Sequence, residues 1–60
     1  MQRKEYLTTE DIARHLDISV ATVRRYIRTG KLTAVRLERE YRVRRDEFER
    51  FLKERETGIE

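Results

Sequence analysis

The first repeating pattern of apolar and polar residues predicts a short helix from about Thr9 to Leu16. Its apolar face comprises Ile12, Ala13 and Leu16. Thr8, followed three residues later by Asp11, is typical of a capping box that begins a helix, with aspartate in place of the usual glutamate. The apolar spacing breaks at Asp17 and Ile18, where we expect the helix to end.

A second helix is predicted from Ser19 to Gly30. Serine is a favoured N-cap because its hydroxyl accepts from an exposed amide, and glycine readily adopts the left-handed conformation in which many helices end. The apolar stripe of this segment comprises Val20, Val23 and Ile27, flanked by Tyr26. Because so short a turn separates the two helices, they must cross sharply, and this arrangement is a helix-turn-helix.

After Gly30 the apolar residues change to the spacing of β-strands. They are Leu32, Ala34, Val35 and Leu37, and then Tyr41 and Val43. The segment Glu38-Arg39-Glu40 separates the two groups, so we expect two short strands joined as a hairpin. Because a two-stranded hairpin is only marginally stable alone, it should pack on the helices as a wing.

A third helix is predicted to close the domain. Asp46 can cap it, and Glu49 completes a second capping-box pattern. Its apolar face comprises Phe48, Phe51 and Leu52, and residues 57–60 should fray. Together these elements predict a single domain over residues 1–60, with a core of about residues 6–55. The expected fold is mainly α with a small β-hairpin, a winged helix-turn-helix with a two-stranded wing and a closing helix.

Positive charge is concentrated in the middle third of the chain, although the whole chain has a net charge of only +3. Residues 24–45 contain nine bases and two acids, a net of +7, whereas residues 1–23 and 46–60 have nets of −1 and −3. Eight of the nine bases are arginine, whose planar guanidinium suits phosphate oxygens and guanine edges. This distribution favours a nucleic-acid partner over an ordinary solvated surface.

The exposed face of the second helix is the leading candidate for DNA contact. Arg24 and Arg28 lie one turn apart with Arg25 beside both, and no acid occurs between Ser19 and Gly30. Like charges this close destabilise a free helix, and an anionic partner would relieve that cost. The helix N-terminus offers amides to a phosphate. The candidate DNA-binding residues of this helix are Ser19, Val20, Thr22, Arg24, Arg25 and Arg28. The alternative is an arginine face that only confers solubility.

The wing contributes two further candidates. Arg39 lies at its tip and Arg42 on its second strand, and we expect them to contact phosphates or to enter the minor groove. For Arg36 and Arg44, DNA backbone contact and pairing with Glu38 and Glu40 are equally good interpretations.

Two segments resemble the excisionase-family DNA-binding domain, a small relative of the MerR-type winged helix. They are YLTTEDIA at residues 6–13 and ISVATVRRYIRTGKL at residues 18–32. Arg42 follows Tyr41 where MerR-type wings have a Tyr-Arg pair, and the resemblance covers about residues 6 to 53. It implies DNA binding through the second helix and the wing, often by several copies side by side, in transcription control or in directing recombination of phage and mobile elements.

The chain departs from this family's pattern at the wing. Many members have a glycine at the tip, where this chain has Glu38-Arg39-Glu40. Two acids there would repel phosphate, so the tip should contact DNA less than in other members or meet a neighbouring protein. Many members also have a proline near Thr33. The chain lacks the effector domain and long dimerisation helix of MerR regulators, so we expect no small-molecule effector.

Other classes of function find little support in the composition. There is no cysteine and one histidine, His15, without carboxylates grouped around it, so we expect no metal and no cofactor. The sequence shows no nucleophile–base pair and no glycine-rich phosphate loop, so we do not expect an enzyme. No apolar run approaches the roughly 20 residues that span a bilayer. We therefore expect a cytoplasmic protein that binds double-stranded DNA and no membrane.

A domain of this size covers few base pairs, so we also expect cooperative self-association on repeated DNA sites. The alternative is a protein–protein adaptor that keeps the winged-helix fold and uses its glutamate-rich third helix as a contact surface. Salt discriminates between them, because binding through Z phosphates weakens with a log–log slope of about −0.9Z.

Overall fold

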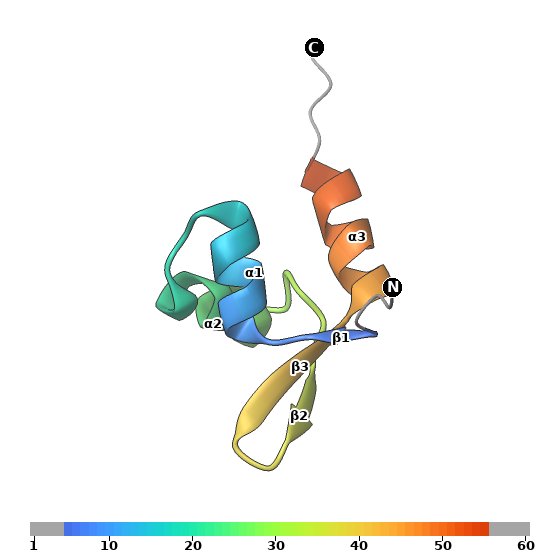
Figure 1. Cartoon of the computed structure of the whole chain (residues 1–60). Coiled ribbons are helices and arrows are strands. Elements are labelled where there is room, and N and C mark those ends of the chain that lie inside the picture. Colours follow the sequence, from blue (N-terminus) through green and yellow to red (C-terminus); the bar gives the residue numbers. More distant parts are fainter. Residues whose placement is uncertain (1–4, 56–60) are drawn as a thin grey trace.

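The computed structural model describes residues 5–55, which form three helices and a three-stranded antiparallel sheet (Figure 1). In chain order the elements are β1 (Tyr6–Leu7), α1 (Thr9–Leu16), α2 (Val20–Arg28), β2 (Val35–Leu37), β3 (Glu40–Arg44) and α3 (Arg45–Arg55). α1 packs on α2, and the hairpin of β2 and β3 extends away from them. The fold is the predicted winged helix-turn-helix.

The limits of α1 follow from local hydrogen bonds. The amide of Asp11 donates to Thr8 Oγ1 at 3.0 Å, and the amide of Thr8 donates to Asp11 Oδ2 at 3.0 Å. This is the predicted capping box. At the other end Asp17 adopts the left-handed conformation with φ 59°, and the amide of Ile18 donates to the carbonyl of Ala13 at 3.0 Å.

α2 begins and ends as its sequence predicts. Ser19 is the N-cap, and its Oγ accepts from the amide of Thr22 at 3.1 Å. Gly30 is left-handed with φ 84°, and its amide donates to Ile27 while that of Lys31 donates to Tyr26. These two bonds form a Schellman motif, which satisfies carbonyls at the end of the helix.

The sheet contains one strand more than the sequence predicted. Its order is β1-β3-β2, and Leu7 of β1 lies opposite Val43 of β3. Two residues are too few to show the alternation that identifies a strand, so β1 escaped prediction. Leu32 and Ala34 were also expected in the first wing strand, but β2 begins only at Val35. Leu32 is instead buried in the core, with 1% of its surface exposed.

α3 begins at Arg45, two residues earlier than a helix capped by Asp46 would begin. β3 runs directly into α3, and the amide of Arg45 donates to the carbonyl of Glu5 at 2.9 Å. Asp46 therefore lies in the first turn and does not cap the helix, so that prediction is wrong. The capping role fails because an N-cap flanks the helix, whereas Asp46 is itself helical. The predicted fraying of residues 57–60 falls outside the described residues.

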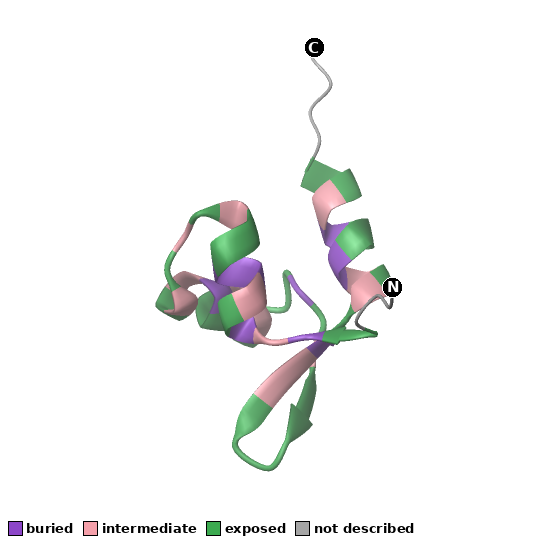
Figure 2. Cartoon of the chain, in the orientation of Figure 1, coloured by how far each residue is buried: buried purple, intermediate pink, exposed green. Residues whose placement is uncertain are grey.

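The core lies where the helices meet the sheet (Figure 2). Its buried hydrophobic residues are Leu7, Ile12, Ala13, Val23, Leu32, Val43, Phe48 and Phe51. One residue each from α1, α2 and β3 is completely buried, namely Ile12, Val23 and Val43. Phe48 and Phe51 are buried as predicted, and Leu52 packs beside them half-buried. This core holds α2 by its inner side and leaves the outer side to solvent.

Candidate nucleic-acid interface

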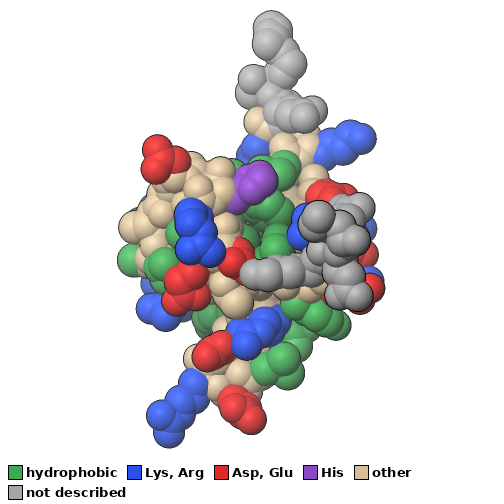
Figure 3. Space-filling view, viewed as in Figure 1, with side chains coloured by type: hydrophobic (Ala, Val, Ile, Leu, Met, Phe, Trp, Pro, Cys, Tyr) green, Lys and Arg blue, Asp and Glu red, His purple; other side chains and the backbone are tan. Residues whose placement is uncertain are grey.

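The single histidine has a packing role. His15 is exposed, and its ring meets the ring of Phe48 edge-on at 5.4 Å. In Figure 3 it lies at the surface between α1 and α3. Residues 5–55 contain no group of three or more histidine, cysteine, aspartate or glutamate side chains that could hold a metal ion. Within the same residues, no helix is both long and apolar enough to span a membrane.

The outer side of α2 is the most basic surface of the helix-turn-helix. Val23 is completely buried, and Tyr26 and Ile27 are half-buried on the same side. This orientation turns Arg24, Arg25 and Arg28 outward, and all three are exposed. Among the described residues none of the three makes a hydrogen bond or an ion pair. Their charge is therefore uncompensated within that part of the chain.

The side chains of the other candidate residues on this helix are less available for contact with DNA. Ser19 is exposed, but its hydroxyl caps the helix and shares a 2.9 Å hydrogen bond with the hydroxyl of Thr22. Thr22 is half-buried, and Val20 is half-buried against the core. The first two helical amides, at Val20 and Ala21, have no acceptor within residues 5–55. Any anion contact at this end would therefore use backbone amides more than side chains.

The tip of the wing is a two-residue turn, because Leu37 pairs with Glu40 across the hairpin. Glu38, the first residue of that turn, has a left-handed φ of 56°. Arg39 follows it, exposed and without a hydrogen bond or ion pair among residues 5–55. The tip thus presents one free guanidinium between two glutamates.

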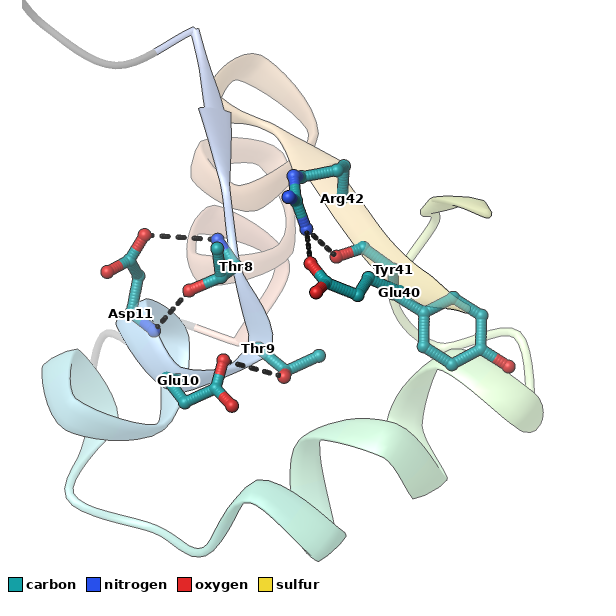
Figure 4. Close-up of polar contacts among 7 residues, drawn as sticks. All are labelled: Thr8, Thr9, Glu10, Asp11, Glu40, Tyr41 and Arg42. Atoms are coloured by element: carbon teal, nitrogen blue, oxygen red, sulfur yellow. Dashed lines mark hydrogen bonds and ion pairs between the residues drawn. The ribbon is translucent and has the colours of Figure 1, made fainter. Parts of the chain in front are cut away.

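Arg42 is not free. Its Nη1 donates to Glu40 Oε1 and, at 3.4 Å, to the carbonyl of Tyr41 (Figure 4). Its side chain is 32% exposed, against 66% for that of Glu40. Pairing with the tip glutamates was an alternative for Arg36 and Arg44, but the pair forms at Arg42.

The two other wing arginines have different partners. The guanidinium of Arg36 lies 6.0 Å from the centre of the Tyr41 ring, which is a cation–π distance. Arg44 Nη2 lies 3.0 Å from Asp46 Oδ2 in the first turn of α3. Arg44 is thus paired, but with Asp46 and with neither Glu38 nor Glu40.

A pocket of about 170 Å³ lies between α2 and the wing. It is lined by Arg24 of α2, by Arg39, Glu40, Tyr41 and Arg42 of the wing, and by Thr8, Thr9 and Glu10 at the start of α1. Three of the predicted site residues are therefore brought together here, whereas Arg25 and Arg28 lie elsewhere on α2. The start of α1 was not predicted to lie beside the wing, because only the pairing of β1 with β3 brings it there.

The comparisons with known proteins agree with this geometry. A family model described as a helix-turn-helix domain matches residues 6–56. Neither the curated proteins nor the solved structures contain a match to the chain. The matched span includes both helices of the helix-turn-helix, the wing and α3. The chain therefore belongs to the excisionase-like helix-turn-helix family, whose members bind DNA and are typically not enzymes.

Proposed function

We propose that this protein binds specific sequences of double-stranded DNA by inserting α2 into the major groove while its wing contacts the flanking backbone. The observation that supports this most strongly is the outer side of α2. Its three arginines are exposed and have no partner among the described residues. A guanidinium that meets a guanine edge in bidentate fashion discriminates bases by about 1–3 kcal/mol.

The individual contacts divide by position. Arg25 and Arg28 lie on α2 outside the pocket and are proposed to reach base edges. Arg24, Arg39 and Arg42 share the pocket between α2 and the wing and are proposed to contact backbone phosphates. The amides at the start of α2, near Ser19 and Val20, would meet another phosphate, with Thr22 beside them.

Such binding suits a transcription regulator or an accessory factor that directs recombination, the roles that the excisionase-family resemblance implies. Either role is exercised in the cytoplasm, without a small-molecule effector or a cofactor. Because one domain covers few base pairs, the proposal includes cooperative binding of several copies to repeated sites.

The test is selection of bound sequences from a random DNA pool, followed by titrations of the selected site at increasing salt. About five phosphate contacts should give a log–log slope of roughly −4 to −5. Removing two base-reading arginines with Arg25→Gln and Arg28→Gln should weaken binding about 100-fold or more.

A matched control is available on α3. Arg50→Gln with Lys53→Gln makes the same change in net charge, and both side chains are exposed and without partners among residues 5–55. This control should weaken binding by less than about threefold, because salt screens charges remote from the interface. Equal losses for the two double variants would mean that α2 has no special role.

One observation favours the adaptor as a second candidate. The large hydrophobic residues that are exposed among residues 5–55 all belong to the sheet, and they are Tyr6, Val35 and Leu37. In the strand register Tyr6 lies opposite Arg44, and Val35 lies opposite Arg42. Their side chains therefore share the outer face of the sheet, and hydrophobic atoms gather beside the hairpin in Figure 3. Binding to no DNA, or affinity that is flat with salt, would favour this adaptor.

A further inference from the structure

The ion pair between Arg42 and Glu40 lies within the pocket that is proposed to face DNA. The two residues are two positions apart on β3, so their side chains emerge on the same face of the strand. In Figure 4 they turn toward each other, while the ring of Tyr41 points away to the other side. The guanidinium is thereby held against its own strand by a carboxylate and a carbonyl.

The surroundings of this pair are suited to an anion. Arg24 and Arg39 line the same pocket, and neither has a hydrogen bond or ion pair among the described residues. Glu10 also lines the pocket, but it already accepts a hydrogen bond from Thr9 Oγ1 at 3.4 Å. Two carboxylates of the described residues line the pocket, those of Glu10 and Glu40, and of these only Glu40 forms an ion pair with an arginine of the pocket.

The two partners differ in how freely they can move. The side chain of Glu40 is 66% exposed, whereas that of Arg42 is 32% exposed. Glu40 can therefore swing into solvent while Arg42 stays at the pocket wall. An exposed ion pair of this kind is weak enough to be exchanged for another anion.

We propose that Glu40 competes with DNA for Arg42. In the complex the pocket binds one backbone phosphate of the DNA, and in the free protein the Glu40 carboxylate blocks that site. This inference rests on the proposed DNA-binding function. Binding exchanges one anionic partner of Arg42 for another and releases Glu40 to solvent. The competition lowers affinity by the same factor for every DNA sequence, because a phosphate carries no base identity.

The test is a double-mutant cycle on the selected DNA site. Glu40→Gln removes the competing charge and should tighten binding about 3- to 10-fold, since exposed pairs of this kind are worth up to about fivefold in affinity and a charge that repels phosphate is also lost. In an Arg42→Ala background the same substitution should gain less than about twofold, because its target is gone.

Glu38→Gln is the matched control. It removes the same charge two residues away, from a side chain that has no ion pair among residues 5–55. Equal gains from Glu38→Gln and Glu40→Gln, or a gain from Glu40→Gln that persists without Arg42, would overturn the competition. Failure of the unsubstituted protein to bind any DNA would instead refute the proposed function itself.

A second measurement keeps the test independent of affinity. In the free protein, the side-chain NMR signal of the Arg42 guanidinium should shift on Glu40→Gln and should stay in place on Glu38→Gln. An Arg42 signal that is indifferent to Glu40→Gln would refute the ion pair on which the proposal depends.

Discussion

Replacing Glu38 by glycine at the tip of the wing should stabilise the fold. Glu38 is the first residue of the two-residue turn between β2 and β3, and its φ is 56°. Two-residue hairpin turns with a left-handed first residue strongly favour glycine there, because a side chain with a Cβ is strained in this region. The excisionase-family resemblance also implies a glycine at this tip.

The expected magnitude is the difference between two effects. The left-handed conformation costs an ordinary residue about 1–2 kcal/mol. Glycine also gives the unfolded chain more conformational freedom, which lowers the stability of the fold by about 0.4–1 kcal/mol. The net stabilisation should therefore be about 0.5–1 kcal/mol, which corresponds to a rise in Tm of about 4–8 °C for a domain of this size.

Urea unfolding followed by circular dichroism measures this change. The midpoint should rise while the m value stays constant, because the surface exposed on unfolding is unchanged. Glu38→Ala is the control, since it removes the same charge but keeps a Cβ. If alanine stabilises the protein as much as glycine does, the effect comes from charge, and the argument from backbone strain is refuted.

Three further predictions test the cap, the core and the division of contacts. Thr8→Ala removes one half of the capping box and should cost about 1 kcal/mol in urea unfolding, with Thr8→Ser restoring most of it. Val23→Asp should abolish the folded circular dichroism spectrum, because it puts an unpartnered charge at a completely buried position; a folded variant would contradict the packing of α2. Arg25→Ala should cost about 1–3 kcal/mol of binding and relax base preference, whereas Arg42→Ala should weaken all sequences alike. Selection from a random pool checks this pair, and equal losses of specificity in the two variants would refute the division of roles between them.

The elements that were predicted best are those whose limits depend on near neighbours. The capping box of Thr8 and Asp11, the N-cap at Ser19 and the left-handed Gly30 all involve residues within a few positions along the chain. Their hydrogen bonds can be inferred from residue type and spacing alone. The helix-turn-helix could therefore be predicted from the sequence alone.

The elements that were missed depend on partners far away in the chain. β1 is recognisable only because β3 lies beside it, and the first amide of α3, that of Arg45, donates to the carbonyl of Glu5. A two-residue strand has no period of its own, and local capping rules do not include an acceptor supplied by another element.

The side of α2 that faces outward follows from the amino-acid sequence alone, because the spacing of Val23 and Ile27 leaves the arginines on the other side. Which arginines share a surface with the wing, and which are paired with acids, depends on the packing of the whole chain. Arg24 meets Arg42 in one pocket because the β1–β3 pairing brings segments far apart in the chain together, and Arg42 pairs with Glu40 because both side chains leave β3 on one face. Contacts between distant segments depend on how the whole chain packs, and no local pattern encodes them.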